Sequence, residues 1–173
     1  MKFHEHIIRV TVPGLPCEVT REELSGELAD FAHRPEHFLE EVTKSEVVSP
    51  ERRGSEPGSI AFERNIYFGH LVFHETVQIG ADGSYRSHAA GSGERPASDF
   101  SMQIEEPEPG QLFIRFIYFE DRPEVPTAIE MNSREQQVDY LRRLAYESKD
   151  RALWRRCLPI LLSAKWRLRT DYC

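Results

Sequence analysis

The sequence predicts an α+β fold in which a curved, seven-stranded antiparallel sheet wraps around one long C-terminal helix. Two observations predict it. Six consecutive strand-like segments are separated only by short turns, and a long amphipathic segment follows them. Consecutive antiparallel strands leave an apolar face that needs a cover. Because one helix is too narrow to fill the concave side of such a sheet, we also expect an internal cavity.

The N-terminal part supplies one strand and two short helices. The first strand covers residues 3–12 and is closed by Pro13-Gly14. Thr20 and Glu23 have the spacing of a capping box, in which each side chain accepts a hydrogen bond from the backbone of the other residue. A helix therefore starts after Thr20. Pro35 ends it, and one further helical turn is expected after this proline.

Turn-forming residues separate the six strands that follow. Gly69-His70 is a two-residue connection of the kind that tight hairpins need, with glycine supplying a positive φ. Ala81-Asp82-Gly83 makes the next turn, and Pro107-Glu108-Pro109-Gly110 joins the last two strands. The expected strands are residues 43–50, 59–68, 71–79, 84–90, 98–106 and 111–119.

The long helix is expected after a Pro-containing linker, with Ser133 as its N-cap. Pro159 should end or kink it, because proline lacks the amide hydrogen and clashes with the preceding turn. We expect residues 1–173 to form one domain, with 159–173 as an extension whose apolar run 160–166 is a candidate homodimer contact. The apolar stripe of the helix consists of Val138, Leu141, Leu144, Ala145, Ala152, Leu153 and Trp154.

Charge and composition argue against several classes of protein. The formal net charge of −7 disfavours a nucleic-acid partner. No segment approaches the roughly 18 apolar residues of a membrane span, so no membrane insertion is expected. The charged N-terminus lacks the apolar core of a signal peptide, and Cys17, Cys157 and Cys173 are scattered along the chain. These features indicate a cytoplasmic protein with reduced thiols.

Cofactor and metal motifs are absent from the sequence. No GxGxxG, Walker A, HExxH or GxSxG pattern occurs, and we expect no cofactor. His4 and His6 share one face of the first strand, a spacing that can chelate a metal, but no third ligand is evident. No metal site is therefore expected.

The Gly69-His70 hairpin predicts which side chains share a face. With this turn, Arg64 lies opposite Glu75 on an otherwise apolar face, where two buried charges are almost obliged to pair. The pair either takes part in chemistry or only orients the sheet. The same alternation assigns the side chains that would line a cavity. The candidates for ligand contact are Phe62, Ile66, Phe73, Met102 and Ile117 on the sheet, and Tyr146 and Trp154 on the long helix.

Two more polar side chains are expected on this face. Extending the register across the 81–83 turn places His88 opposite Glu75, and matching Met102 with Arg115 brings this arginine to the same side. A buried histidine beside a carboxylate can act as a general acid or base, and an arginine can hold a carboxylate, enolate or phenolate oxygen. The candidate catalytic residues are therefore Glu75, His88, Arg64 and Arg115.

Three segments, taken in order, carry a family resemblance. Residues 64–69 (RNIYFG), followed by Glu75-Thr76-Val77, are similar to a central hairpin, and residues 104–116 (IEEPEPGQLFIRF) are similar to a last hairpin. Residues 143–150 (RLAYESKD) are similar to the middle of a closing helix. Together they resemble the AtaL-like branch of the START-like, or SRPBCC, superfamily over residues 1–158. Two features depart from that pattern, the small pair Ser25-Gly26 and the segment 159–173.

The resemblance implies a helix-grip fold around a ligand cavity. The superfamily it points to includes lipid carriers, plant hormone receptors, polyketide aromatases and cyclases, and lyases. Two hypotheses follow. The protein is a cofactor-independent biosynthetic enzyme of cyclase or lyase type that acts on a largely apolar substrate by acid–base and conformational control. Alternatively, it is a carrier or sensor that binds a small hydrophobic or aromatic metabolite without changing it. Fold alone does not choose between them.

Overall fold

The computed structural model describes residues 1–11, 19–93, 95–122 and 133–170, with side chains described as far as Cys157. The expected turn at residue 13, the Pro-containing linker, Cys17 and Cys173 lie outside these ranges. The elements, in chain order, are β1 (Lys2–Arg9), α1 (Arg21–His33), the 3-10 turn η1 (Pro35–His37), β2 (Lys44–Val47), β3 (Arg52–Arg53), β4 (Ile60–Phe68), β5 (Leu71–Ile79), β6 (Tyr85–Ala89), β7 (Ser98–Glu105), β8 (Phe113–Glu120) and α2 (Arg134–Thr170).

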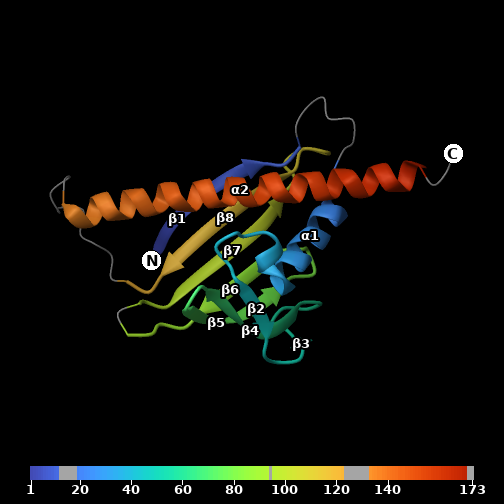
Figure 1. The fold of residues 1–173 in the computed structure, drawn as a ribbon. Helices are drawn as coiled ribbons and strands as arrows, with labels where there is room; N and C mark the ends of the chain where they lie inside the picture. The colour runs from blue at the N-terminus through green and yellow to red at the C-terminus, as the bar shows by residue number, and fades with distance from the viewer. Residues whose placement is uncertain (12–18, 94, 123–132, 171–173) are drawn as a thin grey trace.

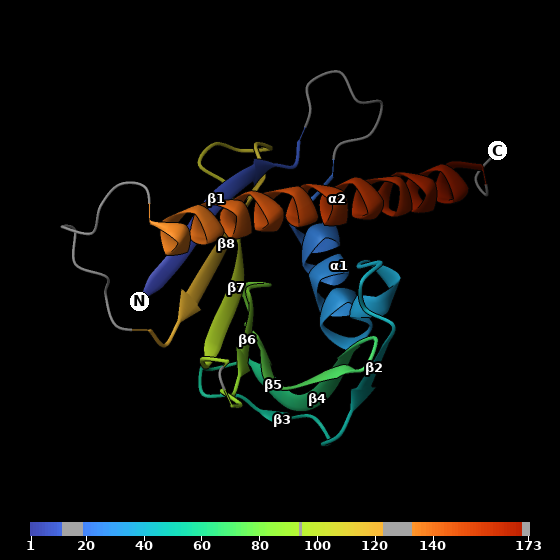
Figure 2. The ribbon, with the colours of Figure 1, turned by 60° about the vertical axis from the view of Figure 1, so that its left-hand side comes forward.

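The described strands form one antiparallel sheet in the order β1-β8-β7-β6-β5-β4-β2, with β3 paired to β4. The sheet curves strongly, and α1 and α2 lie on its concave side (Figures 1 and 2). All seven predicted strands are present, and the two-residue β3 adds an eighth. The α+β class and the helix-grip arrangement are therefore confirmed.

The short helices begin and end where local chemistry predicts. Thr20 Oγ1 accepts a hydrogen bond from Glu23 N at 3.2 Å, and Glu23 Oε2 accepts one from Thr20 N at 2.8 Å. This capping box starts α1, which ends at His33, two residues before Pro35. The further turn expected after the proline is η1. The capping box therefore predicted the start of α1 correctly.

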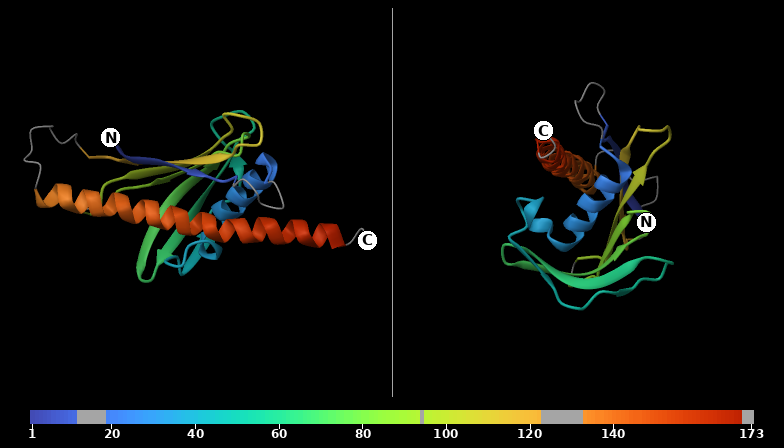
Figure 3. Two further views of the ribbon diagram at one scale, coloured as in Figure 1. Left: turned by 90° about the horizontal axis from the view of Figure 1, so that it is seen from above. Right: turned by 90° about the vertical axis from the view of Figure 1, so that its right-hand side faces the viewer.

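α2 starts as predicted but does not end at Pro159. Ser133 Oγ accepts a hydrogen bond from Gln136 N at 3.3 Å, and the helix then continues to Thr170. At a rise of about 1.5 Å per residue its 37 residues span about 55 Å, so one end runs past the sheet (Figures 1 and 3). Proline deletes only one amide donor, and the flanking turns keep theirs. Because the side chains of 160–166 are not described, a dimer contact there stays a prediction.

The apolar stripe of α2 is divided between two faces. Leu153 and Trp154 are buried against α1 and the sheet, as expected. Val138, Leu141 and Leu144 are exposed instead, so the expectation that one stripe covers the sheet is wrong for the first turns of the helix. In those turns, polar and aromatic side chains occupy the face that packs on the sheet.

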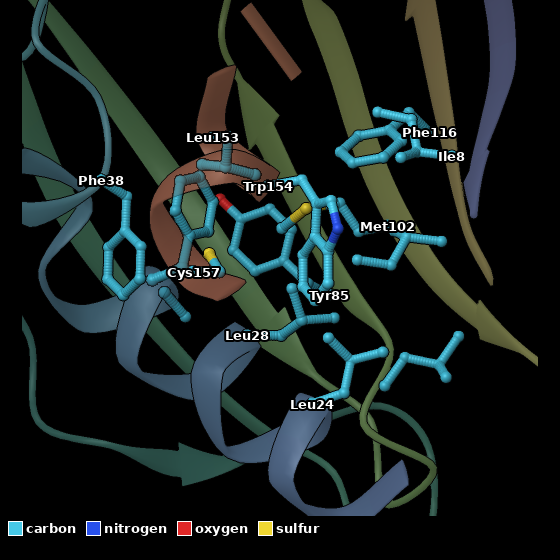
Figure 4. Close-up of a cluster of buried hydrophobic side chains, with 14 of the residues drawn as sticks. Ile8, Leu24, Leu28, Phe38, Tyr85, Met102, Phe116, Leu153, Trp154 and Cys157 are labelled. Atoms are coloured by element: carbon cyan, nitrogen blue, oxygen red, sulfur yellow. The ribbon is translucent and has the colours of Figure 1, made fainter. Parts of the chain in front are cut away.

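The hydrophobic core lies where α1, α2 and the concave face of the sheet converge. Figure 4 shows side chains from both helices closing around Tyr85 and Met102 of the sheet. The labelled members of this core are Ile8, Leu24, Leu28, Phe38, Tyr85, Met102, Phe116, Leu153, Trp154 and Cys157. Within the described residues, neither helix has an apolar stretch long enough to cross a membrane.

The β5–β6 turn presses closely on α1, and this contact is testable. Gly83 has a φ of +79°, and a Cβ at this position would lie 2.7 Å from Ser25 Cβ and closer still to its Oγ. Gly69, with a φ of +60°, has open space around it. We expect Gly69→Ala to lower the free energy of unfolding by about 1–2 kcal/mol, the cost of a left-handed backbone. Gly83→Ala should cost at least about 1 kcal/mol more, because a methyl group must also be accommodated.

Urea denaturation of the two variants measures this difference directly. Equal losses of stability would show that Ser25 moves aside freely and that the turn does not press on α1.

Candidate functional site

The predicted Arg64–Glu75 pair forms on the concave face. The β4–β5 register is the predicted one, with Arg64 opposite Glu75 and Ile66 opposite Phe73. Glu75 Oε2 accepts hydrogen bonds from Arg64 Nε at 3.0 Å and from Nη2 at 2.8 Å. The arginine side chain is 1% exposed and the glutamate side chain 16%. The geometric prediction for this pair is confirmed.

The other N–H groups of Arg64 join the sheet to α1. Nη1 donates to the carbonyl oxygen of Ala32 and, at 3.4 Å, to that of Phe31, both in the last turn of the helix. Nη2 also donates to the Tyr85 hydroxyl at 2.6 Å. A cation is favoured here because the last carbonyls of a helix carry partial negative charge. The guanidinium therefore holds α1 on the sheet and has little donor capacity left for a substrate.

Tyr85 belongs to this cluster, although sequence reasoning missed it. Ile79 pairs with Tyr85 and not with Ser84, so the tyrosine points into the core. Burial raises the pKa of Tyr85 to about 12. The phenol is therefore protonated at neutral pH, and its oxygen accepts the hydrogen bond from Arg64.

The expected inward orientation of His88 and Arg115 is wrong. His88 pairs with Thr76, and its Nδ1 lies 2.8 Å from Asp99 Oδ1 on the convex face. Arg115 pairs with Gln103 and forms ion pairs with two glutamates on that same face. A catalytic role for either residue inside the sheet therefore loses its geometric basis.

Both errors come from turns that are one residue longer than expected. Gly80 N donates to Ser84 O at 2.8 Å, so Ser84 belongs to the β5–β6 turn and not to β6. In the last connection, Ile104 pairs with Ile114 and not with Phe113, so the β7–β8 turn holds one residue more than expected. Leu112, in this turn, accepts a hydrogen bond from Val10 N at 2.9 Å through its carbonyl oxygen. A shift of one residue moves every side chain of a strand to the other face.

Six of the seven side chains expected to line a ligand cavity do lie on the concave side. Ile117 is the exception, for the same reason as Arg115. No ligand contact is yet established for any of them. Phe62, Ile66, Met102 and Trp154 are buried, and Phe73 and Tyr146 are half-buried.

A second buried polar cluster ties β1 and β8 to α2. Tyr118 Oη donates to Asp150 Oδ2 at 2.6 Å, and His6 Nε2 lies 3.2 Å from the same oxygen. His4, on the same face of β1, lies 3.4 Å from Glu147 of α2. Both carboxylates thus meet imidazole rings that enter from the edge strand of the sheet.

The His6 imidazole is buried with its hydrogen bonds incomplete. Its side chain is 9% exposed, and its ring stacks on Phe116 with centroids 5.0 Å apart. Neither ring nitrogen makes a well-directed hydrogen bond to a described residue, although Nε2 is within ion-pair distance of Asp150. A buried unpaired polar group costs about 1–3 kcal/mol, and the few that native proteins keep call for an explanation such as a catalytic role. His6 is therefore the leading candidate for acid–base chemistry.

Aromatic rings form a wall beside this cluster. Tyr118 stacks on Phe100 and on Tyr146, with centroid separations of 4.7 and 4.3 Å. Lys149 Nζ lies 5.2, 5.3 and 5.6 Å from the centroids of Phe100, Tyr118 and Tyr146. Phe100 also contacts Tyr85 at 5.9 Å, so the wall connects the two polar clusters. Stacked rings with a cation beside them suit a flat aromatic molecule that carries a negative oxygen.

Burial sets the protonation states next to His6. It lowers the pKa of His4 below the usual value, and the neighbouring His6 adds to this effect. It raises the pKa of Tyr118, and the Asp150 carboxylate raises it further. At neutral pH His4 is therefore uncharged, and Tyr118 remains a hydrogen-bond donor.

The sequence contained only part of the signal for this second cluster. The HxH spacing placed His4 and His6 on one face, and Tyr146 and Asp150 lie one helical turn apart. β1 pairs with β8, and these strands are the first and the last of the sheet in sequence. Neither segment alone predicts this pairing.

A groove of about 590 Å³ lies on the convex face of the sheet. It is lined mainly by outward-facing side chains of β5 to β8, among them Gln78, His88, Asp99 and Ile117. The cavity expected on the concave side stays a prediction.

Solved structures with the same fold support the architecture. The chain is similar to the protein TTHA0849 from Thermus thermophilus, with 16% identity, 90% of this chain and 97% of that chain covered, and a TM-score of 0.54. It is similar to the Zhui aromatase/cyclase from Streptomyces sp. R1128, with 11% identity, 91% and 92% coverage and a TM-score of 0.50. It also matches the di-domain ARO/CYC StfQ of the steffimycin biosynthetic pathway, with 11% identity and a TM-score of 0.57, over 94% of this chain and 51% of that one.

The family is shown by sequence. No curated protein sequence matches this chain significantly. A family model does match, over residues 8–152, and this range contains most of the sheet, the Arg64 cluster and Asp150 of the second cluster. The chain therefore belongs to the AtaL family, described as acetylaranotin biosynthesis cluster protein L.

Proposed function

We propose that this protein is a cofactor-independent enzyme of small-molecule biosynthesis that catalyses a cyclisation or an elimination on a largely apolar, aromatic metabolite. The buried His6 beside Asp150 carries the proposal, because an imidazole next to a carboxylate can move a proton near neutral pH. The biosynthesis cluster in the family description supports it. The buried, unpaired thiol of Cys157 fits a cytoplasmic location.

The proposed reaction uses His6 as the proton carrier. The imidazole removes a proton from a carbon next to a substrate carbonyl, and Asp150 stabilises the imidazolium that forms. The same proton then returns to an oxygen of the substrate as a ring closes or water leaves. The rings of Phe100 and Tyr146 hold the substrate flat, and Lys149 stabilises the negative charge that develops on its oxygen.

The Arg64 cluster has a supporting place in this proposal. Both hydrogen bonds from Arg64 to Glu75 end on Oε2, and the glutamate side chain is the more exposed of the pair. Glu75 is thus a second candidate acid–base group on the concave face. Arg64 positions this carboxylate and the end of α1, and does not itself contact the substrate.

Replacing His6 tests the proposal. We expect His6→Asn to lower product formation about a hundredfold or more, because a well-placed general acid or base contributes about that much. His88→Asn, on the convex face, should retain product formation within a few-fold of the wild type. The measurement is metabolite profiling by liquid chromatography and mass spectrometry in a producing strain whose chromosomal copy is deleted and replaced by each variant at matched protein level.

Full product formation by a folded His6→Asn variant would remove His6 from the mechanism. A loss in His88→Asn that equals the loss in His6→Asn would point to the convex groove instead.

The uncharged state of His4 predicts an acid-sensitive fold. Because the folded pKa lies below the unfolded value of about 6.5, the unfolded state binds more protons as the pH falls. The free energy of unfolding should therefore decrease as the pH drops below about 6.5. His4→Gln should show a shallower decrease in urea titrations between pH 7.5 and 5, while His70→Gln in the exposed β4–β5 turn should follow the wild type. Identical slopes for all three proteins would contradict this assignment.

A carrier or sensor is the second candidate function. It is favoured because nearly all N–H groups of Arg64 already donate to acceptors of the protein itself. An arginine with a purely architectural role is bonded in this way. This alternative predicts that the purified protein retains one small molecule per chain, unchanged after incubation. Native mass spectrometry measures the bound mass at the start and the end, and a change in that mass favours the enzyme.

A further inference from the structure

The outward face of α2 carries exposed aliphatic side chains that no described element covers. Val138 is 48% exposed, Leu141 62% and Leu144 45%. Ala145, Ser148 and Ala152 continue the same face at helical spacing and are exposed as well. Figures 2 and 3 show α2 as a straight rod along one side of the molecule, with its outer side facing away from the sheet. Exposed apolar side chains that gather on one face of a helix are typical of an interaction surface.

Three of the four acidic residues of α2 face the body of the protein, where Arg142 and Arg156 also have partners. Asp139 forms ion pairs with Arg122 and Arg142, and Asp150 and Glu147 meet the histidines of β1. These three carboxylates thus point toward the body of the protein. Glu135, in the first turn, is the remaining acidic residue of the helix.

The outward face keeps basic residues without partners. Arg134, Arg151 and Arg155 are exposed and form no ion pair within the described residues. The helix sequence contains ten Lys and Arg against four Asp and Glu, whereas the whole chain has 22 against 29. The helix is basic although the protein as a whole is acidic. Its charge therefore favours a negatively charged partner.

We propose that this face of α2 docks on the surface of an anionic phospholipid bilayer. An amphipathic helix binds in the plane of the interface when apolar side chains enter the acyl boundary and arginines contact acidic headgroups. Leu141 and Leu144 supply the apolar side chains, and Arg151 and Arg155 supply the contacts with acidic headgroups. A second copy of the chain fits this face less well, because the arginines of two such helices would repel each other.

Docking on α2 would also bring the proposed site to the bilayer. Residues on the opposite face of the same helix, Tyr146, Asp150 and Trp154, form part of the aromatic wall, the second polar cluster and the core. An apolar metabolite concentrates in a membrane, so a protein lying on it takes up such a molecule without passing it through water. The docking itself does not depend on any reaction at His6.

Vesicle flotation of the 173-residue chain tests the docking. The probes are large unilamellar vesicles of phosphatidylcholine alone, and of phosphatidylcholine with 30 mol% phosphatidylserine. We expect binding to the phosphatidylserine vesicles to be at least about tenfold tighter than to the neutral ones, and to weaken strongly in 0.5 M NaCl, where charges are screened beyond about 4 Å. Leu141→Glu and Arg155→Glu should each weaken it about tenfold.

Arg53→Glu in β3 is the matched control for Arg155→Glu. It makes the same charge change at an exposed position far along the chain from α2, and it should bind like the wild type. His6→Asn should also bind like the wild type, which separates docking from the proposed catalysis. The proposal is overturned if the wild type does not bind phosphatidylserine vesicles, if it binds neutral vesicles equally well, or if Arg53→Glu and Arg155→Glu weaken binding equally. The first of these results would leave an acidic protein as the occupant of this face.

Discussion

The buried guanidinium of Arg64 is the interaction on which the rest of the structure depends. A charge that is 1% exposed must have every donor satisfied, and its acceptors come from a neighbouring strand, from β6 and from the last turn of α1. Those hydrogen bonds hold α1 on the concave side of the curved sheet. With α1 in place, Leu24 and Leu28 can close the core against Trp154 of α2. Removing one partner would leave an unpaired charge in that core, which is far costlier than losing an exposed ion pair.

α2 is attached to the sheet by a second set of polar contacts with a different character. Asp150 accepts from Tyr118 and lies beside His6, whose hydrogen bonds are incomplete, whereas the Arg64 cluster is nearly saturated. The Arg64 guanidinium has almost no donor left unused, whereas the His6 ring keeps unused hydrogen-bonding capacity. This contrast is the basis for proposing a structural role for the first cluster and acid–base chemistry at the second. The carboxylates of Glu147 and Asp150 face the histidines of β1.

Sequence reasoning succeeded where a local rule is strict. The capping box started α1, and the Gly69-His70 turn defined the β4–β5 register and thereby the Arg64–Glu75 pair. It failed where a turn could hold one residue more. The β5–β6 turn closes with a bond from Gly80 N to Ser84 O, and Leu112 in the β7–β8 turn bonds to Val10 of a distant segment. Each added residue exchanged the two faces of the following strand, so Tyr85 replaced His88 on the concave side. Helical periodicity identified α2 and its apolar residues but could not tell which of them face water.

By itself the sequence determined the order of elements, the α+β class, the central hairpin and the buried ion pair on it. These follow from alternation, capping and turn chemistry, which act over a few residues. The tertiary structure alone decided that β1 lies beside β8, that His6 meets Asp150 and that the apolar turns of α2 face outward. Such contacts join residues more than a hundred positions apart, and their geometry depends on the curvature of the whole sheet. No local pattern encodes it.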